Sequence, residues 1–258
     1  GVGVVAILWG KNPMTLFAGL GATSAVLMLV FKDTITGLAA GVRLTSNDML
    51  HKGDWITVKS VDANGIVEDM SLTTVKVRNF DNTIVTISPT TLVNGSFQNW
   101  IGMQKSGGRR VKRGVYFDFR SVRLVDETLK RNLLAKHFAT EDSFKLKESL
   151  QKAIDKDIQE GKDIEDLKNP AALAPTNLQL YRKFMEKYLR QRPEVNTDLT
   201  LMVRHMEATQ CGLPIEFYFF IKDKVWVNYE HILADIMEHA YALANEFGLK
   251  IYEQYPEQ

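Results

Sequence analysis

A long apolar run near the start of the chain dominates its hydrophobic pattern. The eighteen residues from Met14 to Phe31 carry no ionisable side chain, and the run ends at Lys32-Asp33-Thr34. As a helix the run would be about 27 Å long, close to the ~30 Å hydrocarbon thickness of a bilayer. We therefore predict a membrane-spanning helix. A buried helix of a soluble core is the alternative. A secretory signal peptide is disfavoured, because the charged n-region and the small-residue cleavage site that it needs are missing.

Small residues gather on one face of this predicted helix. At 100° per residue, one face holds Ala18, Ala22, Ala25 and Leu29, with Lys32 at its end and Gly19 and Gly21 beside it. Small residues allow transmembrane helices to approach one another closely. We expect this face to pack against other helices.

Charged residues on either side of the run predict its orientation. The apolar residues 1–9 suggest the end of an earlier membrane helix within 1–12, followed by a turn at Lys11-Asn12-Pro13. Cationic residues after the run outnumber those before it, which places the C-terminal side in the cytoplasm. A charge deep in lipid costs about 2.5–3.5 kcal/mol, so Lys32 and Asp33 should mark the membrane boundary.

A second, shorter helix is expected after this boundary. Asp33 or Thr34 can cap it, and apolar residues recur at helical spacing from Ile35 to Val42. Residues 13–50 are thus predicted to form a kinked pair of helices.

From 51 to 104 the pattern changes to short β-branched segments. The expected strands are 55–58, 65–70, 74–79 and 83–88, separated by turn signals such as Asn64-Gly65 and Asp81-Asn82. This pattern predicts a small antiparallel β-barrel (Sm-like) or a curled sheet.

Residues 105–258 follow a Ser106-Gly107-Gly108 linker and predict an α/β domain. Strands are expected at 111–119, 199–206, 214–221 and 249–254, and helices at 122–138 and 228–247. The order βαββαβ is ferredoxin-like, so the soluble part is of α+β class. The polar stretch at about 140–196 is interpreted as a helical insertion that projects from the domain.

Composition and motifs exclude several kinds of function. The net charge of +1 disfavours a nucleic-acid partner held by bulk electrostatics, and the single Cys211 excludes an internal disulfide. The five histidines lack zinc-site spacing, and phosphate-binding loops and nucleophile motifs are missing. We predict a protein without enzymatic activity, cofactor or metal.

Three other groups of residues allow more than one interpretation. The aromatic strand Phe217–Phe220 could stack RNA bases, or could be a sheet face covered by helices. The cluster Arg109-Arg110 with Lys112 and Arg113 could be a solvated hinge or could touch lipid headgroups. The carboxylates of Asp54, Glu68 and Asp69 could act as a pair, or could be solvated strand positions.

Four stretches together resemble a known family. They are GLGATSAVLMLVFKDTITGLAAGV from 19, GDWITV from 53, GIVEDMSLTTVKVRNFDNTIVTISPTTLVNG from 65 and GLKIYEQYP from 248. Their order resembles the small-conductance mechanosensitive channel (MscS) family, especially its YbdG-type miniconductance branch. The resemblance covers nearly the whole chain apart from the insertion.

The resemblance implies a homoheptamer in a bacterial inner membrane, surrounded by lipids and passing ions and small solutes. It places the pore constriction at Leu29 and Ala25, helix packing at Ala18, Gly21 and Ala22, and the kink and cytoplasmic pore mouth at Lys32 and Asp33. Where the family has a sealing leucine and a kink glycine, this chain has Ala25 and Asp33. Ser24 and Met28 stand where the family often has glycines, Thr90 replaces the asparagine of its Pro-Asn pair, and the chain ends after Tyr255-Pro256, where the family would begin a C-terminal barrel.

The predicted function is a tension-opened channel that releases solutes on hypoosmotic shock. One alternative is a membrane-tethered module that binds RNA or protein without conducting. Another is a related channel gated by a cytoplasmic ligand, with 140–196 as its sensor.

Overall fold

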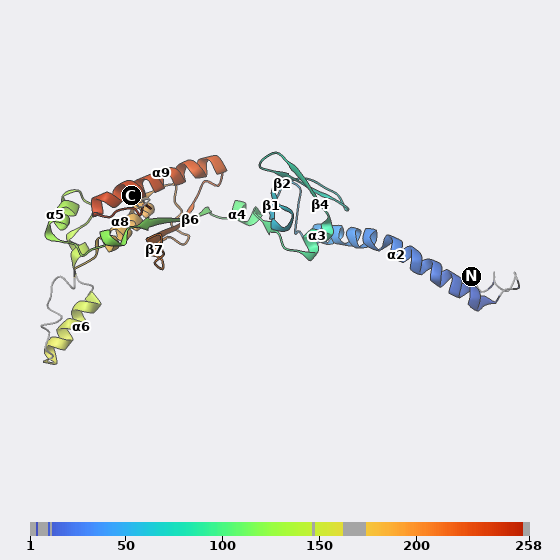
Figure 1. The fold of residues 1–258 in the computed structure, drawn as a ribbon, viewed down its shortest axis with the longest axis horizontal. Coiled ribbons are helices and arrows are strands. Elements are labelled where there is room, and N and C mark those ends of the chain that lie inside the picture. Colours follow the sequence, from blue (N-terminus) through green and yellow to red (C-terminus); the bar gives the residue numbers. More distant parts are fainter. Residues whose placement is uncertain (1–3, 5–9, 11, 146–147, 162–173, 255–258) are drawn as a thin grey trace. The chain divides into compact units, whose positions relative to one another are not determined.

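The computed structural model describes residues 4, 10, 12–145, 148–161 and 174–254 (Figure 1). It divides into two compact units, 1–102 and 103–258, which we describe separately. The predicted end of an earlier helix in 1–12 and the chain end at Tyr255-Pro256 fall largely outside the described residues.

The first unit begins with one long helix, α2 (Pro13–Ser46). The Asn12 side chain accepts a hydrogen bond from the Met14 amide at 3.0 Å, and Pro13 occupies the first turn, where no donor is lost. The predicted break at Lys32-Asp33-Thr34 is wrong, because the helix continues through these residues. Lysine and aspartate are both compatible with a helix interior, so a membrane boundary at this point does not require the helix to end.

The rest of this unit is a five-stranded antiparallel sheet in the order β4-β3-β2-β1-β5. Its elements are β1 (Trp55–Val58), η1 (Lys59–Val61), β2 (Ala63–Met70), β3 (Val75–Asn79), β4 (Ile84–Ile87), α3 (Pro89–Asn94) and β5 (Gln98–Asn99). Alternate apolar residues from β1, β2 and β3 are buried, as the period-two pattern predicts. Leu44, from the last turns of α2, is fully buried in the same core, so helix and sheet share one hydrophobic centre.

The second unit is built on a three-stranded antiparallel sheet in the order β6-β8-β7. Its elements are β6 (Arg109–Phe117), η2 (Phe119–Ser121), α5 (Glu127–Ala135), η3 (Glu141–Phe144), α6 (Glu148–Gln159), α8 (Asn177–Gln191), β7 (Met202–His205), β8 (Leu213–Ile221), α9 (Trp226–Ala244) and η4 (Asn245–Phe247). A short helix, α4 (Ile101–Lys105), precedes them at the boundary between the units.

The last predicted strand is reduced to one bridge, between Phe117 and Ile251. The Asp118 amide donates to the Lys250 carbonyl at 2.9 Å, and the Tyr252 amide donates to the Tyr116 carbonyl at 2.8 Å. With this bridge, the chain order across the sheet is fourth, first, third, second. That order is the ferredoxin-like arrangement the sequence predicts, and the fold class is confirmed.

The interpretation of 140–196 as a projecting insertion is wrong for its second half. Helix α8 buries Leu180, Tyr181, Met185 and Leu189 in the main core of this unit. The Tyr181 hydroxyl donates to the Ala240 carbonyl of α9 at 2.6 Å, so α8 and α9 lie side by side (Figure 1). The helix predicted over 122–138 is shorter in the structure, where α5 spans Glu127–Ala135.

Candidate functional site

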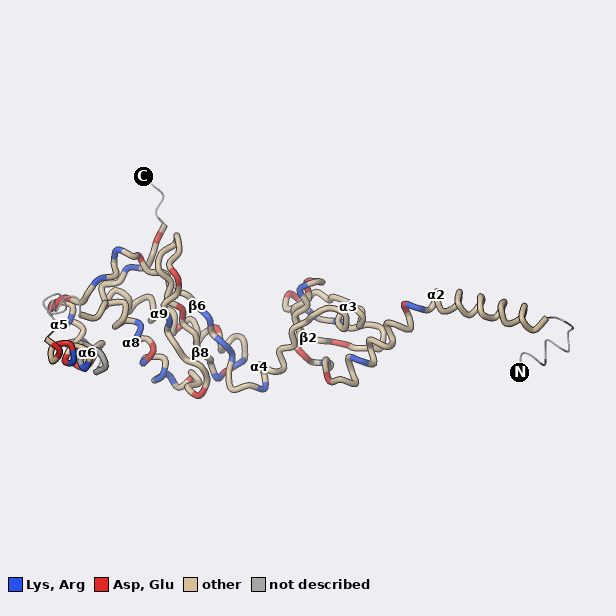
Figure 2. The backbone as a smooth tube through the Cα atoms, turned by 90° about the horizontal axis from the view of Figure 1, so that it is seen from below, with Lys and Arg blue, Asp and Glu red and all other residues tan. Residues whose placement is uncertain are grey.

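Helix α2 is the element that carries most of the predicted site residues. Among the described residues it is the helix long and apolar enough to cross a membrane. Figure 2 shows that no charged residue lies on it before Lys32 and Asp33. The hydroxyl of Thr23 donates to the Gly19 carbonyl at 2.8 Å, so this polar group is satisfied within the helix itself.

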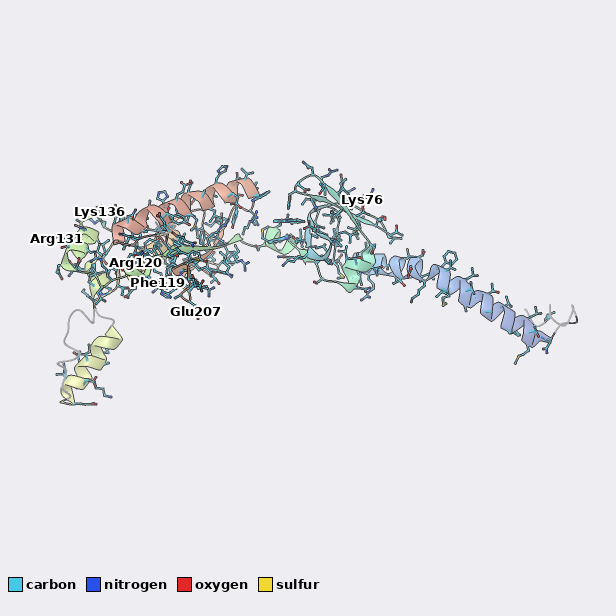
Figure 3. All side chains as sticks on the ribbon, viewed as in Figure 1. Lys76, Phe119, Arg120, Arg131, Lys136 and Glu207 are labelled. Atoms are coloured by element: carbon cyan, nitrogen blue, oxygen red, sulfur yellow. The ribbon has the colours of Figure 1, made fainter. Side chains whose placement is uncertain are left out.

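Most of α2 has no cover from the rest of the chain. Between residues 13 and 39, Leu16 and Gly37 are half-buried and all the others are exposed, and the side chains project freely around the ribbon (Figure 3). Leu29 is 75% exposed and Met28 is 70% exposed. The exposed, uncharged run from Met14 to Phe31 requires lipid or other protein around it.

The continuous helix extends the predicted face of small residues. Ala18, Gly21, Ala22, Ala25 and Leu29 lie within about 60° of one direction at 100° per residue. Because the helix does not break, Lys32 and Thr36 follow on the same face. Sequence reasoning missed Thr36, since it assigned that residue to a separate helix axis.

Lys32 and Asp33 lie in mid-helix and not at a helix end. Within the described part of the chain neither side chain forms an ion pair. The Thr36 hydroxyl donates to the Lys32 carbonyl at 2.8 Å, one turn back along the helix. This bond satisfies the Thr36 hydroxyl within the helix. The predicted capping by Asp33 or Thr34 does not occur, because no helix begins there.

Asp33 lines a hollow between α2 and the β-sheet loops of the same unit. The hollow has a volume of about 480 Å³. Its lining is formed by Asp33, Thr34, Thr36, Gly37, Thr73, Ser88, Pro89 and Thr90. The structure thus brings the predicted kink residue Asp33 close to the Pro89-Thr90 pair, which the sequence singled out separately.

The last turns of α2 are fixed to the β-domain by close packing. Ala40, Gly41 and Leu44 are its buried residues, and a Cβ atom on Gly41 would overlap the Leu72 backbone carbonyl. Sequence reasoning missed Gly41. The signal available was a glycine inside a helical pattern, which costs about 1 kcal/mol relative to alanine and so suggests a packing role.

The other groups of interest lie in the second unit. Phe217 and Phe219 are fully buried in the core, while Tyr218 and Phe220 point to the opposite face of the sheet and are half-buried. Arg110 lies over the Tyr218 ring, 5.9 Å from its centroid, and Arg109 lies over Tyr229 at 4.4 Å. The basic cluster is thus partly engaged by aromatic rings.

Acidic and metal-ligating residues are dispersed. Glu216 is 7% exposed, and its carboxylate binds Arg204 at 2.6 Å and lies 3.9 Å from the Lys112 ammonium. Glu68 pairs with Arg78 at 2.6 Å. Across the described residues no three His, Cys, Asp or Glu side chains gather into a possible metal site.

Comparison with known proteins matches the first unit to a family of channels. Residues 33–102 match the family described as "Mechanosensitive ion channel, beta-domain". The small-conductance mechanosensitive channel MscMJ of Methanocaldococcus jannaschii is 33% identical over 90 residues, which are 35% of this chain and 25% of the relative. The large-conductance mechanosensitive channel MscMJLR of the same organism is 29% identical over 145 residues, 55% of this chain and 39% of the relative. The chain thus matches a quarter to two-fifths of these relatives' length.

Solved structures match over almost the whole chain. The cryo-EM structure of Arabidopsis thaliana MSL1 matches with a TM-score of 0.64 at 11% identity. The match covers 96% of this chain and 69% of the MSL1 chain. The closed-state crystal structure of Helicobacter pylori MscS matches with a TM-score of 0.59 at 14% identity. The match covers 96% of this chain and 74% of the H. pylori chain. At these identities the similarity shows a shared fold: an apolar helix, a β-domain and an α/β domain.

Proposed function

We propose that this chain is a member of the MscS family of mechanosensitive channels and that it forms an ion channel opened by membrane tension. The observation that carries the proposal is helix α2. Its apolar surface over residues 13–39 is exposed in a single chain, although the C-terminal turns pack firmly on the β-domain. A helix of this kind is stable when lipid covers one face and other copies of the helix cover another.

The small-residue face is the side proposed to line the pore and to contact neighbouring helices. Leu29 and, above it, Ala25 form the constriction, and Ala18, Gly21 and Ala22 allow close packing. An apolar constriction that is narrow enough loses its water, and a dry constriction blocks ions. Leu29 supplies most of this seal because Ala25 is small.

The assembly is proposed to be a homoheptamer, the number implied by the family resemblance. Within it the α2 helices surround one pore, with lipids on the outer side. The YbdG-type branch remains part of this prediction.

Membrane tension favours the state that occupies more area in the bilayer. If the open state has tilted or separated α2 helices, tension shifts the population towards it without any chemical step. Because α2 is one unbroken helix from Pro13 to Ser46, tilting of its membrane part would be passed on to the β-domain on which its last turns pack. Ions and small solutes would then leave the cell when external osmolarity falls.

Lys32 and Asp33 are proposed to lie at the cytoplasmic mouth of the pore. Their opposite charges are adjacent in sequence, so we expect weak selectivity between cations and anions. The proposed location is a bacterial inner membrane, in a multi-pass protein whose β-domain and α/β domain are cytoplasmic.

Patch recording on purified full-length protein in liposomes tests the proposal. Stepwise suction should evoke discrete currents that protein-free liposomes do not show. A correctly assembled protein that stays silent up to the tension at which the bilayer ruptures would contradict it.

A second candidate function is a membrane-tethered binding module. It is favoured by Tyr218 and Phe220 on the sheet face opposite the helices, with Arg110 over one of the rings. Buried Glu216 on the same face argues against a polyanion, because its carboxylate pairs with Arg204 and so occupies a cation that a polyanion would need. Micromolar RNA binding by a protein that gives no current would support this alternative.

A further inference from the structure

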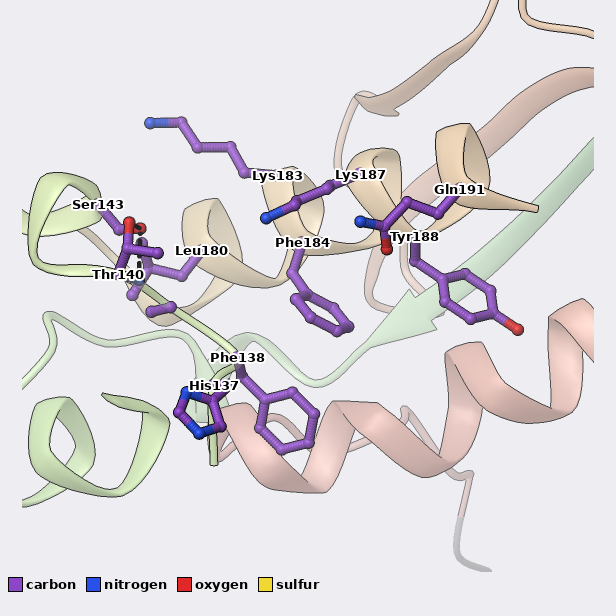
Figure 4. Close-up of a pocket in the computed structure, with 11 residues that line it drawn as sticks. His137, Phe138, Thr140, Ser143, Leu180, Lys183, Phe184, Lys187, Tyr188 and Gln191 are labelled. Carbon is purple, nitrogen blue, oxygen red and sulfur yellow. Dashed lines mark hydrogen bonds between the residues drawn. The ribbon is translucent and has the colours of Figure 1, made fainter. Parts of the chain in front are cut away.

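A hollow in the second unit lies between helix α8 and the segment that follows α5 (Figure 4). Its volume is about 340 Å³, within the ~300–1,000 Å³ typical of small-molecule sites. It is far in sequence from α2 and shares no residue with the proposed pore. The channel function described above does not use it.

The floor of the hollow is aromatic. Phe138 and Phe184 meet edge to face, with ring centroids 5.2 Å apart, and both are half-buried, so part of each ring remains accessible. Tyr188 adds a third half-buried ring from the next turn of α8. Such a floor suits a flat apolar group.

The rim of the hollow is cationic. Lys183 and Lys187 stand one turn apart on the exposed side of α8, and both line the hollow. Like charges at this spacing destabilise a helix by about 0.2–0.5 kcal/mol, so the pair opposes helix stability. Figure 4 shows both lysines on the α8 side, opposite His137 and Phe138.

The acidic residues close in sequence to residues that line the hollow are paired with other cations. Glu186 pairs with Arg190 at 3.3 Å, Asp142 with Lys145 at 2.6 Å, and Glu141 lies 3.8 Å from Lys130. In the part of the chain that the structure describes, Lys183 and Lys187 form no ion pair. Both ammonium groups therefore remain free to bind an anion.

Hydroxyl groups face the lysines from the other side of the hollow. Thr140 and Ser143 both line it, and the Ser143 hydroxyl accepts a hydrogen bond from the Thr140 amide at 3.1 Å. This bond fixes the start of η3 and leaves the Thr140 hydroxyl within 3.3 Å of the Ser143 hydroxyl. Hydroxyl and ammonium groups that line one hollow are both partners for phosphate oxygens.

We propose that this hollow binds a nucleotide-like anion, an aromatic ring system joined to a phosphate. The ring lies on the Phe138 and Phe184 floor, and the phosphate contacts Lys183 and Lys187. An aromatic floor alone would take a neutral ring, and lysines alone would take any phosphate. The combination selects a molecule that carries both.

Equilibrium dialysis with adenosine 5′-monophosphate (AMP) tests the proposal on the purified full-length chain at low salt. We expect saturable binding, with weaker binding of adenosine and of ribose 5-phosphate. The double variant Lys183→Gln/Lys187→Gln should weaken AMP binding by roughly tenfold or more, the effect of losing one or two charge-assisted hydrogen bonds. No current is measured, so the outcome is independent of the proposed channel function.

Matched variants distinguish specific AMP binding in the hollow from nonspecific attraction of an anion to surface lysines. Lys59→Gln/Lys76→Gln removes the same charge from exposed positions of the β-domain and should leave AMP binding unchanged. Phe184→Leu, which keeps an apolar side chain, should weaken AMP binding and leave ribose 5-phosphate binding unchanged. Either of two results overturns the proposal: no saturable AMP binding up to about 10 mM, or equal loss of binding in both lysine pairs.

Discussion

Gly41 of helix α2 lies directly against the backbone carbonyl of Leu72 in the β-domain. A Cβ atom at this position would overlap that oxygen, and its neighbours in the contact are also backbone atoms, which cannot turn away. The contact fixes the end of the proposed pore helix to the sheet. It is the place where movement of α2 would be felt by the β-domain.

Gly41→Ala should therefore destabilise the first unit. Alanine normally stabilises a helix relative to glycine by about 1 kcal/mol, but overpacking against a rigid neighbour costs roughly 1–3 kcal/mol. We expect a lower melting temperature for the full-length protein in detergent. Thermal unfolding followed by intrinsic fluorescence measures it.

Gly37→Ala is the matched control for this prediction. Gly37 lies one turn earlier on the same helix, and a Cβ atom at this position would meet no other atom of the described residues within 4 Å. This variant should be as stable as the parent or slightly more stable. Equal melting temperatures for the two alanine variants would show that the contact with Leu72 is not tight.

Tyr181→Phe tests whether α8 belongs to the core. The buried hydroxyl donates to the Ala240 carbonyl at 2.6 Å, and losing such a bond costs about 0.5–1.5 kcal/mol. We expect unfolding at a lower urea concentration. Tyr241→Phe, at an exposed position of α9, should leave the unfolding midpoint unchanged and serves as the control.

The same tyrosine predicts a dependence of stability on pH. Burial raises the pKa of Tyr181 above its ordinary value of 10.0, because the phenolate would lose its hydration. The folded state thus holds a proton that the unfolded chain releases above pH 10. Stability from this group is complete below pH 10 and decreases above it, and the decrease should be smaller in Tyr181→Phe. An identical alkaline profile in both proteins would contradict the prediction.

The strands could be predicted because their signals are local, and the strand order of the second sheet followed from the βαββαβ succession of elements. Alternation in β2 and β3 and the β-branched runs depend only on neighbouring residues. Helix α8 was misassigned because its buried stripe is set among lysines, arginines and glutamate. A start signal was nevertheless present, since the Thr176 side chain accepts from the Gln179 amide at 3.0 Å, three residues on.

The candidate site was predictable only in part, for a different physical reason. Composition identifies α2 as a membrane helix, and periodicity identifies its small-residue face. Charges at Lys32 and Asp33 indicate a boundary in polarity, but a polarity boundary is not a helix end, so the break was wrong. Which side chains seal a pore depends on several chains, and Leu29 and Ala25 therefore stay predictions.

Neutralising one charge at the proposed pore mouth should change ion selectivity in a predictable direction. Lys32→Gln leaves Asp33 as the local charge and should favour cations, whereas Asp33→Asn should favour anions. The double variant should resemble the parent. Reversal potentials in asymmetric KCl measure this, with a larger effect at low salt because the Debye length is about 10 Å at 0.1 M and 3 Å at 1 M. Shifts of the same sign in both single variants would contradict the assignment.

Leu29→Ser tests the proposed seal. Wetting a constriction of serines is less unfavourable than wetting one of leucines, so the closed state should lose stability relative to the open state. A change as small as about 0.8 kcal/mol per chain, the value of one buried methylene, sums to roughly 5.6 kcal/mol over seven copies. About 5.5 kcal/mol is enough to convert a 99:1 equilibrium to 1:99, so a lower opening tension or a standing leak is expected in patch recordings. Leu27→Ser is the matched control. Leu27 is also exposed and apolar, but it lies about 200° away from Leu29 on the helix, outside the small-residue face. The opening tension of this variant should therefore stay much closer to that of the parent. If the two serine variants open at the same tension, Leu29 is not the gate.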